Sequence, residues 1–117
     1  MHVSNDTTVS VPISQQAVKQ LQAAIAAVLQ TFAAKQKAQR PQRWPMMEWR
    51  FKSSDDPQAS AGSEVEFFEV YCNPNGFSSA FEARTLLTLR TQGGVKVSSE
   101  AKLSSLQADV ENYLQQF

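Results

Sequence analysis

A regular stripe of apolar residues ahead of Pro41 places the strongest constraint on what this chain can fold into. The later members follow the first by 3, 7, 10, 11 and 14 residues, the spacing of one helix face. They are Val18, Leu21, Ile25, Val28, Leu29 and Phe32. Ser14 is a suitable N-cap, and Ile13 can pack on Val18 as a hydrophobic staple. The stripe predicts an amphipathic helix from about residue 15 to residues 36–39, ended by Pro41, whose apolar face needs a second layer.

Beyond a proline-containing connector at residues 40–45, the apolar spacing changes to every second residue. Met47, Trp49 and Phe51 alternate with charged residues, which predicts a half-buried strand. A loop at 53–63 separates it from a second strand at 64–72. The adjacent Phe67 and Phe68 interrupt that alternation, which indicates either a bulge or the use of both faces.

The last third of the chain predicts two more strands and a helix. A turn at Asn73-Pro74-Asn75-Gly76 comes before a strand at about 84–91, with Leu87 and Leu89 inward and Arg84, Thr88 and Arg90 outward. The hairpin Gln92-Gly93-Gly94 leads into a short strand at 95–97. Ser98 or Ser99 then caps a final helix with Glu100 in its first turn. Its stripe consists of Leu103, Leu106, Val110, Tyr113, Leu114 and Phe117.

The predicted fold is α+β in the order α-β-β-β-β-α, an antiparallel meander sheet with two amphipathic helices packed on one face. Residues 12–117 form one domain, and residues 1–11 form a flexible N-terminal tail or a short strand. Leu, Ile, Val and Phe make up about 23% of the chain, close to the level of about 20% below which disorder is typical. The core is therefore modest, and a partner or a second copy, most simply in a homodimer, could complete it.

Charge and cysteine content exclude several classes of function. Eleven basic and eleven acidic residues give a net charge of zero, so the chain has no global field that would hold a polyanion. The single cysteine, Cys72, rules out an intramolecular disulfide. The sequence shows neither a signal peptide nor an apolar run long enough to span a membrane, which favours a cytoplasmic location.

The sequence contains few side chains that could carry out catalysis. The only histidine, His2, lies in the tail, and Cys72 at the end of a strand is best explained as a small half-buried hydrophobe. Glu64 and Glu66 are expected on one strand face and Glu69 on the other, as a solvated acidic edge. We therefore expect no catalytic, cofactor-binding or metal-binding residues, no cofactor and no enzyme activity.

The most uneven feature is the segment from Lys35 to Lys52, where six cations and both tryptophans accompany one acid. Basic residues interleaved with aromatic ones suit single-stranded nucleic acid, because rings stack on bases and cations follow phosphates. The alternative is that Trp49 lies in the core and Trp44 fills the helix–strand junction. The acids that follow, from Asp55 to Glu69, weaken the local field unless the two sets of charges face opposite ways.

The order of strands, followed by Gly-Val-Lys-Val-Ser-Ser-Glu-Ala-Lys-Leu and a closing helix, resembles the β-β-β-β-α single-stranded-DNA-binding coactivator fold over roughly residues 46–117. This resemblance implies a meander backed by a helix; the DNA-contacting residues of that fold have no counterpart here, and the first helix is extra. The order of elements is also similar to that of double-stranded-RNA-binding domains. Those domains carry a basic cluster at the start of the last helix, where this chain has Lys102 alone.

The favoured prediction is a non-enzymatic accessory, assembly or regulatory protein that acts through protein–protein interaction. Two aromatic residues without a clear core position, Phe77 and Phe81, suit such a contact, although folding back over the sheet edge is equally compatible. The alternative is a single-stranded nucleic-acid-binding protein that uses residues 35–52, and a small-ligand carrier ranks third. The candidate interaction surface comprises Arg40, Arg43, Trp44, Arg50, Lys52, Phe77 and Phe81.

Overall fold

The computed structural model describes residues 2–4, 8–10, 14–40, 42–52 and 65–116 of the chain, and it confirms the predicted α+β architecture. The main sheet is an antiparallel meander of four strands in the order β3-β4-β5-β6. The helices and strands are β1 (His2–Ser4), β2 (Thr8–Ser10), α1 (Gln15–Lys37), β3 (Met47–Lys52), β4 (Val65–Cys72), the 3-10 helix η2 (Pro74–Gly76), β5 (Arg84–Thr91), β6 (Lys96–Lys102) and α2 (Leu103–Leu114).

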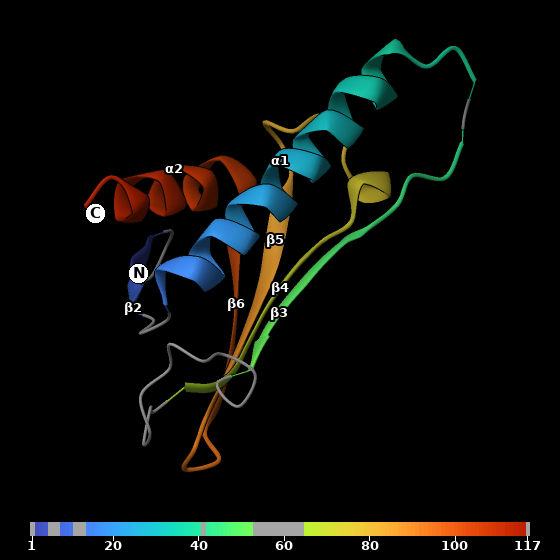
Figure 1. Cartoon of the computed structure of the whole chain (residues 1–117). Coiled ribbons are helices and arrows are strands. Elements are labelled where there is room, and N and C mark those ends of the chain that lie inside the picture. Colours follow the sequence, from blue (N-terminus) through green and yellow to red (C-terminus); the bar gives the residue numbers. More distant parts are fainter. Residues whose placement is uncertain (1, 5–7, 11–13, 41, 53–64, 117) are drawn as a thin grey trace.

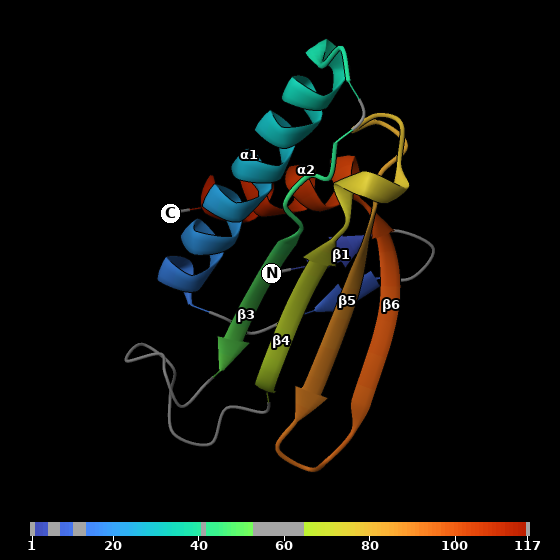
Figure 2. The same ribbon diagram turned by 90° about the vertical axis from the view of Figure 1, so that its right-hand side faces the viewer.

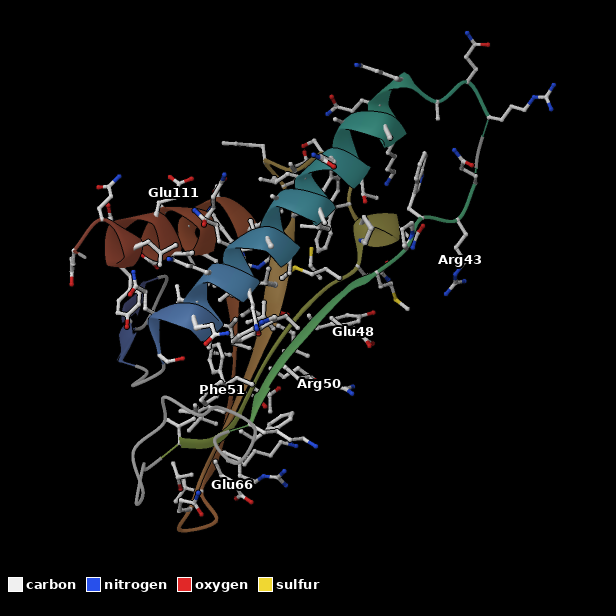
Figure 3. All side chains as sticks on the ribbon, viewed as in Figure 1. Arg43, Glu48, Arg50, Phe51, Glu66 and Glu111 are labelled. Atoms are coloured by element: carbon white, nitrogen blue, oxygen red, sulfur yellow. The ribbon has the colours of Figure 1, made fainter. Side chains whose placement is uncertain are left out.

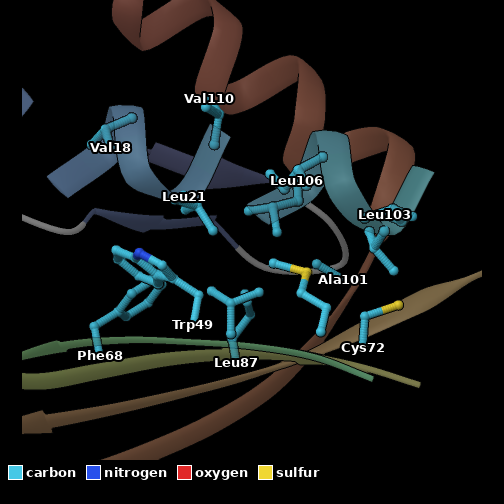
Figure 4. Packing of buried hydrophobic residues seen from close by; sticks show 14 of the residues in the cluster. Val18, Leu21, Trp49, Phe68, Cys72, Leu87, Ala101, Leu103, Leu106 and Val110 are labelled. Carbon is cyan, nitrogen blue, oxygen red and sulfur yellow. The ribbon is translucent and has the colours of Figure 1, made fainter. Parts of the chain in front are cut away.

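Both long helices lie on the same face of the four-stranded sheet, so the molecule has a helix layer and a sheet layer (Figures 1 and 2). The core fills the space between these layers (Figure 4). Trp49 of β3 meets Phe68 of β4 edge to face, with ring centroids 5.8 Å apart and an interplanar angle of 71°. Such a pair adds to the burial of both rings, so it helps to fix the two strands against the helices.

Helix α1 forms for the reasons that the sequence indicates. The hydroxyl of Ser14 accepts a hydrogen bond from the backbone N–H of Ala17 at 3.2 Å, which confirms the predicted N-cap. The buried side chains of the helix are Ala17, Val18, Leu21, Ile25, Val28 and Phe32. The helix ends at Lys37, because Ala38 has extended backbone geometry. Ile13 of the proposed staple and Pro41 lie outside the described residues.

The strands follow the predicted alternation with one irregularity. The pairing of β4 with β5 shifts register between Val65 and Phe67, just before the Phe67-Phe68 pair for which the sequence left a bulge or the use of both faces open. Phe67 and Phe68 then use both faces of the sheet, since Phe67 is half-buried and Phe68 is buried. The turn after β4 is stabilised by Asn73, whose side-chain oxygen accepts from the N–H of Asn75 at 3.0 Å. Gly94 has φ +87° in the β5–β6 hairpin, a conformation that favours glycine. The loop predicted at 53–63 lies outside the described residues.

The boundary between the fourth strand and the last helix corrects the sequence analysis. Ser98, Ser99 and Glu100 belong to β6, so they neither cap α2 nor lie in its first turn. Strand β6 runs to Lys102 because β5 offers a full-length partner, paired from Arg90 with Lys96 to Arg84 with Lys102. The helix then begins at Leu103 without a side-chain cap.

The start of the chain contributes a small second sheet. His2–Ser4 pairs antiparallel with Thr8–Ser10, within the segment that the sequence analysis treats as a flexible tail or a short strand. The backbone of β1 runs beside helix α2. Chain segments from opposite ends of the sequence therefore meet at α2.

Candidate interaction surface

Within the part of the chain that the structure describes, both helices cover one face of the sheet and no element covers the other. We call this second side the open face. Figure 3 shows Glu48 and Arg50 directed away from the helices, whereas Phe51, the residue after Arg50, points toward the core. The outward side chains, with Met46 directly before β3, are Met46, Glu48, Arg50, Lys52, Glu66, Phe67, Glu69, Tyr71, Arg84, Leu86, Thr88, Arg90, Lys96, Ser98, Glu100 and Lys102.

An apolar patch occupies one end of the open face. Leu86 of β5 is 43% exposed, and Met46 just before β3 is 42% exposed. Tyr71 of β4 lies directly across from Leu86 in the strand pairing, and its hydroxyl donates to the sulfur of Met46 at 2.9 Å. Adjacent apolar side chains at this level of exposure on a sheet surface are typical of contact sites.

Arginine–glutamate pairs surround this patch. Arg50 Nε lies 2.5 Å from Glu69 Oε2, and Arg84 Nε lies 3.2 Å from Glu100 Oε2. The hydrogen bond and the negative charge of Glu69 raise the pKa of Arg50, so this guanidinium stays charged. Each pair has no net charge, so these residues make the surface polar without adding to its charge.

A third arginine forms part of the same network at the far end of the face. Arg90 Nε lies 3.9 Å from Glu66 Oε2, and its guanidinium carbon lies 5.3 Å from the centroid of the Phe67 ring. A cation over an aromatic face gains electrostatic attraction, about 0.5–1 kcal/mol at an exposed site. Phe67 is therefore half-buried beneath a charged group.

The acidic residues of β4 correct one detail of the sequence analysis. Glu66 and Glu69 were expected on opposite faces, but both form ion pairs with arginines of the open face. The register shift between Val65 and Phe67 changes the alternation and brings them to the same side. Glu64 lies outside the described residues. The acids and the cations of this region therefore share one surface, where four glutamates offset part of the charge of six cations.

The structure separates the basic residues that the sequence analysis grouped. Arg40 and Arg43 are exposed in the connector between α1 and β3, whereas Arg50 and Lys52 lie on the open face. Figure 3 shows Arg43 and Arg50 in these two separate places. Trp44 is half-buried in the connector. The backbone N–H of Trp44 donates to Asn75 Oδ1 at 2.8 Å, and the backbone carbonyl of Trp44 accepts from Asn75 Nδ2 at 2.9 Å. These bonds tie the connector to η2, which supports the interpretation of Trp44 as a junction residue.

The two loop aromatics also differ from each other. Phe77 is half-buried and packs against the core, whereas Phe81 is 82% exposed. Lys35, one of the cations counted in the basic segment, donates through Nζ to the carbonyls of Pro74, at 2.8 Å, and Phe77. Lys35 thereby holds the β4–β5 connection against α1, so its ammonium group stabilises the fold.

Sequence reasoning missed the apolar members of the open face, although two signals were present. Leu86 and Leu87 are adjacent on one strand, so one of them must face away from the core. Phe67 and Phe68 are likewise adjacent on β4, so one of them must also face away from the core. In each pair the first residue faces outward and the second is buried.

Groups that could carry chemistry are sparse in the described ranges. The Cys72 side chain is fully buried on the inner face, and burial raises the pKa of its thiol to about 11. The residues that the structure describes contain no group of three side chains suited to hold a metal ion. Neither α1 nor α2, the long helices of this part of the chain, is long and apolar enough to cross a membrane.

Two shallow grooves flank α1. One, of about 240 Å³, lies between α1 and the start of β3, next to Met46 and Glu48. The other, of about 340 Å³, lies between α1 and α2 and is lined by Leu29 and Val110 among others. Both are at or below the lower end of the volumes typical of ligand pockets, about 300–1,000 Å³, which weakens the small-ligand interpretation.

Comparisons of the chain with protein-family models, with curated proteins and with solved structures found no match in any of the three.

Proposed function

We propose that this chain is a non-enzymatic accessory or assembly protein that acts by binding another protein surface with the open face of its sheet. One observation carries the proposal. The patch of Met46, Tyr71 and Leu86 stays partly exposed on a sheet face, surrounded by arginine–glutamate pairs. An apolar centre with a polar rim is the composition of protein–protein interfaces.

The charges of the open face favour a protein partner over a nucleic acid. Each of its three arginines has a glutamate within 4 Å (Arg50 with Glu69, Arg84 with Glu100 and Arg90 with Glu66). Binding to a phosphate backbone requires cations that are free to replace counterions. Paired arginines are less suited to that role, and they are common at the rims of protein interfaces.

The buried thiol supports a binding role rather than catalysis by cysteine. A nucleophilic cysteine needs an exposed sulfur with a lowered pKa, and Cys72 has neither property. We also propose that the protein acts in the cytoplasm, where a free thiol stays reduced.

Capture from an extract of the native source tests the proposal, with wild-type chain and two charge variants as bait. Leu86→Arg adds a charge to the apolar patch of the open face, and Gln30→Arg adds the same charge to the exposed side of α1. We expect a nuclease-resistant protein partner that wild type and Gln30→Arg retain and Leu86→Arg loses. Equal capture by all three baits would contradict the proposal.

Single-stranded nucleic acid is the second candidate, favoured by one observation. Lys52, Phe67, Arg90 and Lys96 lie in one row across the four strands. If this row binds phosphates, affinity must fall with salt, and Arg90→Ala should reduce the log–log slope by about 0.7. We expect instead that tryptophan fluorescence does not respond to an oligonucleotide at physiological salt. Salt-sensitive micromolar binding would favour this second candidate.

A further inference from the structure

The strand register arranges the open face into three parallel rows. The first row crosses the strands through Glu48, Tyr71, Leu86 and Glu100, and we call it the acidic row. The middle row is Arg50, Glu69, Thr88 and Ser98, and the basic row is Lys52, Phe67, Arg90 and Lys96. On every strand the acidic and basic rows lie two residues to either side of the middle row. The face is therefore laid out symmetrically about its own centre line.

We propose that a second copy of this chain covers the open face, stacked sheet on sheet about a two-fold axis that runs along the middle row. In this arrangement β3 lies over β3 of the second copy with reversed direction, so each acidic row faces a basic row. This inference rests on the proposed function, because it names the protein that occupies the same surface. Face-to-face sheets with nearly aligned strands are a common packing.

Charge complementarity at the two edge strands supports this geometry. The rotation places Glu48 opposite Lys52 of the second copy and Glu100 opposite Lys96 of the second copy. Each contact occurs twice because a two-fold interface is isologous. Within the described residues, Glu48, Lys52 and Lys96 form no ion pair of their own, so the second copy would supply opposite charges for them.

The central strands β4 and β5 face the second copy through other kinds of contact. Tyr71 lies opposite Phe67 of the second copy, which brings two aromatic rings together near the centre of the interface. Arg50 and Glu69 meet their own counterparts across the axis, but they already form a pair at 2.5 Å within each copy. Thr88 meets Thr88 of the second copy and leaves room for the larger side chains beside it.

The same charges disfavour the other two-fold arrangement. An axis parallel to the strands would lay β3 over β6 and keep each row over itself. Glu48 would then face Glu100, and Lys52 would face Lys96. Like charges placed opposite one another weaken association. The axis along the middle row brings only Arg50 and Glu69 opposite their own counterparts, and each of these is already paired within its own copy. The layout therefore favours the axis along the middle row.

The size of the contact sets the expected affinity. The three rows span four strands about 4.8 Å apart and five residues of about 3.3 Å each. Such a footprint covers roughly 300 Å² of sheet on each copy, or about 600 Å² over both, which is below the range of stable, specific interfaces. We therefore expect a weak, reversible dimer with a dissociation constant in the high micromolar range.

Exchanging the two charges on β3 tests the orientation. Glu48→Lys places lysine opposite Lys52 at two sites, and we expect it to raise the dimer dissociation constant about tenfold or more. Lys52→Glu should do the same with glutamates. The double variant restores opposite charges and should return the constant to within about threefold of wild type. Analytical ultracentrifugation measures each constant, with circular dichroism as the control for folding.

Mixing the two single variants gives a sharper result. A chain with Glu48→Lys and a chain with Lys52→Glu each repel themselves at the β3 edge, but they present opposite charges to each other at both contacts between residues 48 and 52. We expect the mixture to form heterodimers under conditions where each variant alone is monomeric. An additive mixture of monomers would contradict the proposed axis.

A cross-linking experiment tests the position of the axis. Thr88→Cys places two thiols across the axis from each other, within reach of a bismaleimide that spans about 10 Å, the separation of packed sheets. Cys72 is fully buried, so the wild-type chain should give no cross-link. Ala26→Cys on the exposed side of α1 is the matched control and should not cross-link at the same concentration.

The outcomes separate this inference from the proposed function. A chain that is monomeric at high micromolar concentration, or a dimer that Glu48→Lys leaves unchanged, overturns the inference. If that chain still captures a nuclease-resistant partner that Leu86→Arg loses, the proposed function stands without the dimer. If an oligonucleotide binds the open face and no dimer forms, both fail.

Discussion

The inner and the open face of the sheet are built from alternate residues of the same four strands, yet they are stabilised differently. On the inner face, Val70, Cys72 and Ala101 are at most 1% exposed and lie beneath α1 and α2. On the open face, ion pairs such as Arg84 with Glu100 join neighbouring strands while their side chains stay 38% and 64% exposed. The inner face therefore contributes most of the stability, and the side chains of the open face contribute less.

The adjacent leucines of β5 give the largest expected contrast between the faces. Leu87→Ala should lower the free energy of unfolding by about 2–4 kcal/mol, because Leu87 is 6% exposed in the core. Leu86→Ala, on the open face, should cost less than about 1 kcal/mol. Urea denaturation of both variants measures the difference. Equal losses would mean that the open face is covered in the folded chain.

Two threonines of the same strand provide a smaller, polar contrast. The Thr85 hydroxyl is buried and donates to the Ala101 carbonyl at 2.9 Å. Thr85→Val should therefore cost about 0.5–1.5 kcal/mol, the net value of a hydrogen bond. Thr88→Val on the open face should change stability by less than about 0.5 kcal/mol. Thermal unfolding compares the two variants, and a larger loss for Thr88→Val would reverse the assignment of faces.

The inner face should also respond to alkaline pH through its single thiol. Burial raises the pKa of Cys72 from 9.0 to about 11, so folding favours the neutral form. A raised pKa contributes stability that is fully present below pH 9 and is lost as pH rises through about 11. Wild type should therefore lose stability more steeply than Cys72→Val in that window. Parallel pH profiles for the two chains would show that the thiol does not contribute.

The ion pairs of the open face should give the smallest effect. Arg84→Gln removes an exposed pair and should change the free energy of unfolding by no more than about 0.5 kcal/mol, because solvent and salt screen such pairs. Gln keeps a polar side chain at this position but removes the positive charge. A loss above 2 kcal/mol, roughly the cost of a core change, would show that the pair supports the sheet itself.

Much of the fold could be predicted from the sequence, because the spacing of apolar residues is regular in the elements that bury one face in the core. The stripe that begins at Val18 gave α1, and the alternation around Trp49 gave β3, both with boundaries within two residues of the structure. Strand β6 was predicted too short because Ser98, Ser99 and Ala101 carry little intrinsic strand preference. Their conformation comes from pairing with β5, which is a tertiary effect.

The candidate surface was harder to predict, because its charges are matched across strands. Arg90 and Glu66 are 24 positions apart in the chain, and their contact depends on the register of β4 with β5 and on the bulge. Counting cations between Lys35 and Lys52 could not show that Lys35 binds two carbonyls or that Arg50 is already paired. The alternation of residues along a strand identifies which side chains face outward, whereas the register between paired strands determines which of these side chains are in contact.

The direct junction between β6 and α2 restricts where this chain can tolerate insertions. Lys102 ends the strand and Leu103 begins the helix, and the Leu103 N–H donates to the Ala83 carbonyl at 3.0 Å. Each residue of an α-helix turns it by about 100°, so one residue inserted after Lys102 would rotate Leu106 and Val110 away from the sheet unless it looped out. The Gly93–Gly94 hairpin has no such coupling, since its tip is exposed and extra residues there alter only the turn. Length variation in descendants of this sequence should therefore collect at the hairpin and be absent from the junction.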